Sequence, residues 1–191
     1  FLAVLSRWTQ DVSRNLPPAS RTLFQFLCAL EDSDRLEWIV KQVWPKIWIS
    51  LGLEGDAPAL EQAMSAVKSA SLVEHQSLGE QIRYDIHPSV SQAGLEEADE
   101  KFRGAVDAEM ASFWIGGFQA ARSGEPDEKT QLVIMSGLRS APYLIRQKIW
   151  PIASTLLQEA FNRDRSPGTV ALILPLLRHI AQATKGMDQE L

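Results

Sequence analysis

The chain has 191 residues, which is enough for one large domain or two small ones, each with a core of its own. Its apolar content of 45% and charged content of 23% are ordinary for a soluble globular protein, and its net charge of −5 argues against a general binder of nucleic acid or of anionic membranes. The single Cys28 excludes an internal disulfide bond and favours a reducing, cytoplasmic setting.

No targeting or membrane-spanning segment is expected. No apolar run approaches the length of a membrane span, and Arg7 with Asp11 interrupts the apolar start too early for a signal peptide. The chain begins at Phe1 and enters a helical pattern directly, so we expect it to be a piece of a longer protein.

Helical periodicity predicts that most of the first 70 residues are α-helical. Pro17 ends the first helix, and Asp34 followed by Glu37 forms a capping-box pattern at the start of the third. Pro45, among tryptophans, is expected to turn the chain into a further short helix. The expected helices lie at 2–14, at 18–31, after Asp34, and at 59–70 beyond a loop at 52–58.

The stretch 71–90 is the one place where the sequence predicts β structure. Apolar and polar residues alternate over 82–87, which is the pattern of a half-buried strand. A first strand is expected at 72–74, with a polar, glycine-containing loop at 76–81. A lone hairpin needs a helical face to pack on, and helices, a hairpin and a helix from residue 89 follow each other in the order of a winged helix.

The second half of the chain is predicted to be helical throughout. The stretch 123–127 is a clear break, and Ser166 before Pro167 is a favourable helix start. Gly116 and Gly117 lie inside a helical pattern and indicate close helix packing, not a phosphate loop. The expected helices lie at 89–97, 99–122, 130–147, 150–162 and 167–184.

No catalytic constellation is present in the sequence. The chain has no phosphate-loop motif, no dinucleotide-binding glycine motif and no nucleophile elbow, so we expect no enzymatic activity. His75 and His87 could meet across the hairpin, but without a matching third ligand no metal site is expected. Cys28 is expected to be a buried structural thiol, and His179 a solvated or partner-facing side chain.

The triplet Ile86-His87-Pro88, at the end of the second predicted strand, carries a specific resemblance. The hairpin stretch that ends in this triplet, together with the helices around it, resembles the winged-helix domain of STAND-class signalling ATPases, which include the NB-ARC and NACHT receptors. In those proteins such a strand ends in an apolar residue followed by histidine, often within a methionine-histidine-aspartate triplet. Ile86 stands in for the methionine, His87 matches the histidine and Pro88 replaces the aspartate. The resemblance implies that His87 reaches the phosphates of ADP in a neighbouring nucleotide-binding domain and holds the closed, inactive state.

The later helices resemble a second part of these proteins. A run of small and large residues is similar to the TPR-like (tetratricopeptide-repeat-like) helices that follow the winged helix in bacterial STAND proteins; it comprises Tyr143, Trp150, Ala153, Leu157, Ala160 and Pro167. We therefore expect a mainly α fold: a winged-helix domain over 1–100, with its wing at 71–87 and one β-hairpin, followed by TPR-like antiparallel helical hairpins over 101–191.

The resemblance implies a non-catalytic regulatory or sensor fragment. Its expected partners are an upstream nucleotide-binding domain and a protein bound by the TPR-like helices, with oligomerisation in the active state of the parent protein. ADP or ATP with Mg²⁺ would bind the parent and not this fragment, so the only expected site residue is the nucleotide-sensing His87.

Two other functions fit the same architecture. One is a free-standing helical adaptor, which a phosphate-loop motif upstream in the gene would argue against. The other is a DNA-binding winged helix, which is disfavoured because the helix in the recognition position offers only Gln62 and Lys68 against Glu61. The wing is also poor in positive charge, with Arg83 against Glu74, Glu80 and Asp85.

Overall fold

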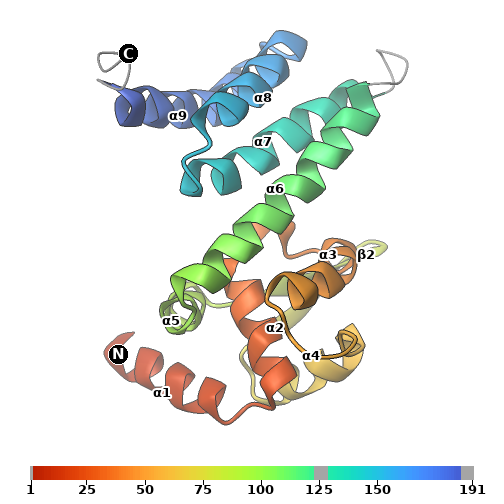
Figure 1. Ribbon diagram of the computed structural model, residues 1–191, viewed down its shortest axis with the longest axis vertical. Coiled ribbons are helices and arrows are strands. Elements are labelled where there is room, and N and C mark those ends of the chain that lie inside the picture. Colours follow the sequence, from red (N-terminus) through yellow and green to blue (C-terminus); the bar gives the residue numbers. More distant parts are fainter. Residues whose placement is uncertain (1, 123–128, 186–191) are drawn as a thin grey trace. The chain divides into compact units, whose positions relative to one another are not determined.

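The computed structural model describes residues 2–122 and 129–185 (Figure 1). These residues are mainly helical and contain one small antiparallel two-stranded sheet, which confirms the predicted balance of helices and a single hairpin. By internal contacts the chain divides into two compact units, Phe1–Val106 and Asp107–Leu191. The elements are α1 (Leu2–Arg14), α2 (Pro18–Ala29), η1 (Asp32–Asp34), α3 (Glu37–Ser50), α4 (Leu60–Ser69), β1 (Glu74–Leu78), β2 (Gln81–Asp85), α5 (Pro88–Glu97), α6 (Glu100–Arg122), α7 (Thr130–Arg146), α8 (Trp150–Arg163) and α9 (Pro167–Thr184).

Helix α2 lies at the centre of the first unit. Its apolar residues Leu23, Phe24 and Leu27 have no exposed surface, and the helix packs against both α4 and α5. An apolar face as broad as that of α2 is typical of a helix that contacts core residues on several sides. The other helices supply the remaining large buried side chains, which include Ile39, Val40, Val43, Trp44, Ile47, Met64 and Val67.

The hairpin is tighter than the sequence predicts. Leu78 pairs with Gln81, so the turn consists of Gly79 and Glu80 alone. Gly79 has a φ of +63°, a conformation that glycine adopts without steric cost and that two-residue hairpin turns require.

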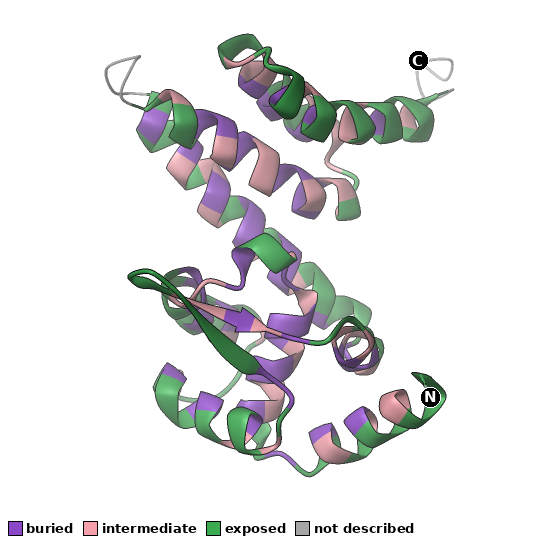
Figure 2. Cartoon of the chain, turned by 180° about the vertical axis from the view of Figure 1, so that it is seen from behind, coloured by how far each residue is buried: buried purple, intermediate pink, exposed green. Residues whose placement is uncertain are grey.

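The predicted first strand at 72–74 and the loop at 76–81 are therefore wrong. Strand β1 is exposed along its whole length (Figure 2), so it lacks the apolar alternation by which a half-buried strand is recognised. Leu72 and Val73 are buried, but they precede the strand. Strand β2 also ends earlier than predicted, at Asp85.

A third extended segment lies beside β2. Leu36 forms an isolated antiparallel bridge with Arg83, and the Tyr84 backbone N–H donates to the Arg35 carbonyl at 2.8 Å. Because Leu36 is extended, α3 begins only at Glu37, and the predicted capping box of Asp34 and Glu37 does not form. Asp34 instead ends the short η1 and is fully buried, while the Glu37 carboxylate accepts a hydrogen bond from the Tyr84 hydroxyl.

Pro45 does not turn the chain into a new helix, as the sequence predicts. Helix α3 runs through it from Glu37 to Ser50. Proline in a helix interior removes one backbone hydrogen bond, and burial of the flanking turns offsets that loss. Trp44 and Ile47 are both buried, and the Trp44 indole N–H donates to the Pro58 carbonyl at 2.8 Å.

The second unit contains α7, α8 and α9, with the part of α6 that starts at Asp107. Helix α7 packs along α8, and α9 contacts both. The contact between α7 and α8 is close because small residues line it: a Cβ added at Gly137 would lie 2.9 Å from the Leu156 carbonyl oxygen. Ser140, Ala141, Ala153 and Ala160 are fully buried in the same unit.

The two glycines of α6 differ in their surroundings. A Cβ at Gly117 would lie 3.2 Å from the Ser136 Oγ atom, which agrees with the predicted close packing, whereas Gly116 faces open space. The predicted start of α9 is confirmed, with Ser166 as the N-cap and Pro167 in the first turn. Within residues 2–122 and 129–185, no helix is long and apolar enough to cross a membrane.

Candidate functional site

His87 lies at the start of α5 and not at the end of a strand. Strand β2 ends at Asp85, and His87 is the N-cap residue of the helix that begins with Pro88. Its Nδ1 atom accepts a hydrogen bond from the Ser89 backbone N–H at 3.2 Å. The side chain is exposed. The prediction of a strand-end histidine is thus corrected to a helix cap.

This cap determines which nitrogen of His87 can act on another molecule. A neutral imidazole has one acceptor and one donor nitrogen, so acceptance at Nδ1 places the proton on Nε2. The backbone N–H groups of Val90 and Ser91 already donate to the His87 carbonyl at 2.9 Å. Pro88 has no N–H, so the side-chain donors at this helix start are the imidazole Nε2–H of His87 and the hydroxyl of the half-buried Ser89.

Arg35 holds the first turns of α5 in place, a role that no pattern in the sequence indicates. The guanidinium is buried, with Nε donating to the Leu27 carbonyl at 2.9 Å and Nη2 to Ser91 Oγ at 2.9 Å. Nη2 also donates to the Leu30 carbonyl at 3.2 Å, and Nη1 pairs with the exposed Asp32 at 2.8 Å. One side chain therefore ties the end of α2 and η1 to the helix that carries His87.

A shallow cavity of about 430 Å³ lies between α1 and α5, next to His87. Ser6, Pro88, Ser89 and Gln92 are among the residues that line it, together with Glu96. Among the described residues of the lining, the one charged group is the Glu96 carboxylate, which would repel a phosphate. The cavity is therefore not suited to an anionic ligand, and the donor role stays with the exposed imidazole.

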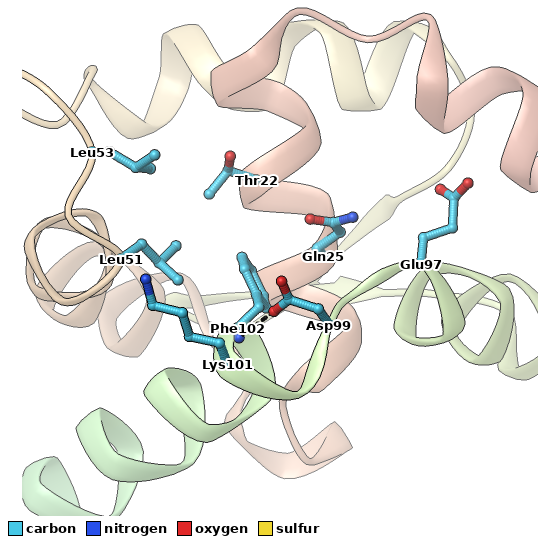
Figure 3. Close-up of a pocket in the computed structure, with 8 residues that line it drawn as sticks. All are labelled: Thr22, Gln25, Leu51, Leu53, Glu97, Asp99, Lys101 and Phe102. Atoms are coloured by element: carbon cyan, nitrogen blue, oxygen red, sulfur yellow. Dashed lines mark hydrogen bonds between the residues drawn. The ribbon is translucent and has the colours of Figure 1, made fainter.

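A second cavity, of about 270 Å³, lies between α2 and the start of α6 (Figure 3). Its carboxylates have structural partners: Asp99 accepts a hydrogen bond from the Phe102 N–H at 2.7 Å, and Glu97 pairs with Arg14 at 3.0 Å. The remaining lining combines Lys101 with the Thr22 hydroxyl, the Gln25 amide and apolar side chains. This arrangement contains no pair of groups placed for acid–base or nucleophilic chemistry.

The other chemically active side chains are dispersed. His75 lies opposite Tyr84 in the sheet, so it does not meet His87, which lies beyond β2. Cys28 is buried as predicted, and desolvation raises the pKa of its thiol to about 12. His179 is exposed beside Trp150, with ring centroids 6.1 Å apart. Among the described residues, no three His, Cys, Asp or Glu side chains are grouped so that they could hold a metal ion.

Comparison of the chain with protein-family models, with curated proteins and with solved structures finds no match.

Proposed function

We propose that this chain is a non-catalytic regulatory region of a STAND-class signalling ATPase. In this proposal the first unit is a winged helix that latches the ADP-bound, closed state through His87. The second unit is a TPR-like array that binds a protein. The nucleotide and Mg²⁺ belong to an upstream nucleotide-binding domain, which would supply the phosphate loop that this chain lacks.

The order of elements in the first unit supports the winged-helix assignment. A winged helix has a helix, a short strand, two helices and a hairpin whose strands pair with the short strand. Here α2 is followed by the bridging residue Leu36, then by α3, α4 and the β1–β2 hairpin, with Leu36 paired to Arg83 of β2. Helix α4 takes the position of a recognition helix.

The main support for a contact between His87 and the phosphates of ADP is the helix cap that His87 forms. With Nδ1 held by the Ser89 N–H, the ring is fixed and exposed, and its Nε2–H can donate to a phosphate oxygen. A charge-assisted hydrogen bond to phosphate contributes about 1.5–3 kcal/mol. A bond present only in the closed state favours that state by about tenfold to more than a hundredfold.

The small residues of the second unit support the TPR-like assignment. Such repeats pack two antiparallel helices closely, and Gly137, Ala153 and Ala160 provide the close approach between α7 and α8. A free-standing adaptor is the second candidate. This candidate is favoured by the exposed apolar side chains of α8 and α9, which could contact a partner protein without a nucleotide-binding domain.

DNA binding is disfavoured by the charges on and around α4. The exposed Glu61 forms an ion pair with Lys41, with 3.8 Å between Oε1 and Nζ. The Nζ atom of Lys68 lies over the Tyr84 ring, 5.7 Å from the ring centroid. Residues 51–100 contain only two lysines and arginines, against ten acidic residues. A surface of this charge would repel the phosphate backbone.

The test uses the intact protein with its nucleotide-binding region. We expect His87→Ala to lose co-purified ADP and to oligomerise without a stimulus, because the closed state loses its phosphate contact. Sizing chromatography together with the nucleotide content of each peak measures both effects. His75→Ala is the matched control, since His75 is also an exposed histidine of this region. A His87→Ala protein that keeps its ADP and stays monomeric would contradict the latch.

A further inference from the structure

Strand β1 is the open edge of the small sheet. Among the described residues it pairs with β2 alone, and all of its side chains are exposed (Figure 2). The other side of the sheet is closed, because the Tyr84 N–H of β2 donates to the Arg35 carbonyl at 2.8 Å. Leu36 adds a bridge to Arg83 on the same side. The sheet can therefore be extended by a further strand at β1 only.

The backbone groups that point outward from β1 belong to His75 and Ser77. In an antiparallel pair, residues alternate between those whose N–H and C=O face the neighbouring strand and those whose groups face away. The two-residue turn makes Leu78 and Gln81 a hydrogen-bonded pair, so the groups of His75 and Ser77 face away from β2. The N–H of Tyr84, opposite His75, also points out of the hairpin. The outward N–H and C=O groups of β1 thus have no hydrogen-bond partner among the described residues.

Strand β1 has few of the features that keep edge strands from pairing. Folded proteins protect such strands with proline, lysine, a β-bulge or a covering helix. The segment Glu74–Leu78 contains neither proline nor lysine, and its register with β2 is continuous, so it has no bulge. Every residue of the strand is exposed, so no described helix covers it. Its open groups fit one class of partner, which is another extended strand.

The surroundings of β1 favour a copy of the same strand over an unrelated peptide. Domains that bind peptides by strand addition take their specificity from pockets for alternate side chains beside the open edge. No residue of β1 lines either of the two cavities described above. A second copy needs no pocket, because in a two-fold arrangement each strand offers the other the same groups.

The sequence of β1 is complementary to itself when two copies run antiparallel about a two-fold axis at the central Gln76. His75 of each copy then faces Ser77 of the other, and their outward N–H and C=O groups form hydrogen bonds in both directions. Glu74, the one acidic residue of the strand, faces the exposed Leu78 of the second copy. A parallel pairing in register would instead bring the two Glu74 carboxylates together, which is unfavourable.

We propose that β1 pairs with β1 of a second copy of this chain, antiparallel and centred on Gln76, so that the two small sheets join into one. One short strand from each copy supplies the contact, so the dimer is weak, with a dissociation constant of about 0.1–1 mM. The net charge of −5 on each chain makes the copies repel each other at long range, so salt strengthens the dimer by screening. This inference goes beyond the proposed function and does not depend on His87.

Sedimentation equilibrium of the purified chain, from about 0.02 to about 1 mM, measures the dimer. We expect monomer at the lowest concentrations and a substantial fraction of dimer at the highest. The dimer fraction should be larger at about 0.3 M salt than at about 0.05 M salt. A chain that stays monomeric throughout would overturn the inference and leave the edge to a strand of another protein.

Ser77→Pro tests whether the edge of β1 makes the contact. Proline removes the outward N–H of this residue and leaves the pairing with β2 intact, because that N–H does not bond to β2. We expect dimerisation to weaken by about tenfold or more. Ser77→Ala is the matched control, since it keeps the N–H and should dimerise like the wild type. Urea unfolding verifies that both variants fold, and wild-type dimerisation of the proline variant would overturn the inference.

Charges placed at Gln76 test the register without a change in the backbone. Gln76→Glu and Gln76→Lys should each weaken the dimer by about fivefold, because like charges then face each other across the two-fold axis. An equimolar mixture of the two variants should associate more tightly than either alone, because opposite charges then meet. A mixture that associates no more tightly would overturn the proposed pairing. None of these results touches the latch, because ADP retention by the intact protein reports on His87 alone.

Discussion

Arg35 is a buried cation whose hydrogen bonds join three segments of the first unit. Its donors satisfy the carbonyls of Leu27 and Leu30 near the end of α2 and the Ser91 hydroxyl of α5. Its backbone carbonyl in turn accepts from the Tyr84 N–H of β2. The guanidinium thus ties α5, which His87 caps, to the end of α2, while the backbone of the same residue holds β2.

Replacing Arg35 with methionine, which has a similar length, should be costly. The variant leaves buried acceptors without donors, so we expect Arg35→Met to lower the free energy of unfolding by about 2–4 kcal/mol. Arg83→Met is the control: its ion pair with Asp85 is partly exposed, and its loss should cost less than about 1 kcal/mol. Urea unfolding compares the two variants, and equal losses would mean that the Arg35 network contributes little.

Gly94 allows α5 to lie directly on α2. A Cβ at this position would lie 2.6 Å from Cys28 Sγ and 2.8 Å from Phe24 Cε1, and both neighbours are buried. Gly94→Ala should therefore destabilise the protein by about 1–3 kcal/mol through overpacking. Gly104→Ala is the same change in the interior of α6 with open space around it, and it should stabilise by about 0.5–1 kcal/mol. Opposite signs in thermal unfolding are the expected result, and a shared sign would refute the close contact.

The Cys28 thiol makes stability depend on alkaline pH. Burial raises its pKa from 9.0 to about 12, so above pH 9.0 the unfolded chain releases the thiol proton while the folded chain keeps it. Because the unfolded state then binds fewer protons, the contribution of Cys28 to stability falls as pH rises through this window, by about 1.4 kcal/mol per pH unit. Below pH 9.0 the contribution is fully present.

The effect of the Cys28 thiol is measured as the difference in unfolding free energy between the wild type and a variant that lacks the thiol. Urea unfolding of the wild type and of Cys28→Ala at about pH 8 and about pH 10.5 separates the thiol from other titrating groups, such as Tyr84, whose pKa is also raised by burial. The wild type should lose more stability between the two pH values than the variant. Parallel losses would show that the thiol ionises equally in both states.

The residue ranges of several helices are predicted closely by the periodicity of the sequence. The expected ranges at 2–14, 150–162 and 167–184 agree closely with α1, α8 and α9. Which side of a helix is buried is less predictable. On α1 the side chains with no exposed surface are Thr9 and Ser13, whereas Trp8 is 40% exposed, because the helix packs against α5 through its small polar residues.

The errors of prediction have a common physical origin. The predicted position of β1 is wrong because the strand forms by backbone pairing with β2. All of its residues are exposed, so its sequence shows no alternation of apolar and polar residues. The start of α3 was placed wrongly because Leu36 is held extended by Arg83, a residue distant in sequence. The turn predicted at Pro45 does not form, because tertiary packing of α3 outweighs the local preference of proline.

The candidate site was predictable only in part. His87 was identified from a sequence triplet, but its role as the cap of α5 depends on where β2 ends and on the conformation of Ser89. Arg35 was not identified, because a single arginine after an acidic turn does not differ from an exposed one until the chain folds around it.

Acidic and basic residues are unevenly distributed along the chain. Residues 51–100 contain two lysines and arginines against ten acidic residues, while residues 129–185 contain eight against two. Over whole units the balance is 10 against 15 in Phe1–Val106 and nine against nine in Asp107–Leu191, so the net negative charge of the chain belongs to the first unit. The proposed phosphate contact of the first part then depends on one imidazole and not on a basic surface.

The rate of ADP dissociation from the intact protein tests the latch most directly. His87→Asp keeps an N-cap for α5, because a carboxylate also accepts from the Ser89 N–H, but it removes the donor and adds a negative charge. We predict that this variant releases ADP about tenfold to more than a hundredfold faster than the wild type. His75→Asp, with the same charge change on β1, should release it at the wild-type rate. Equal rates for His87→Asp and the wild type would contradict the central claim that His87 holds the nucleotide.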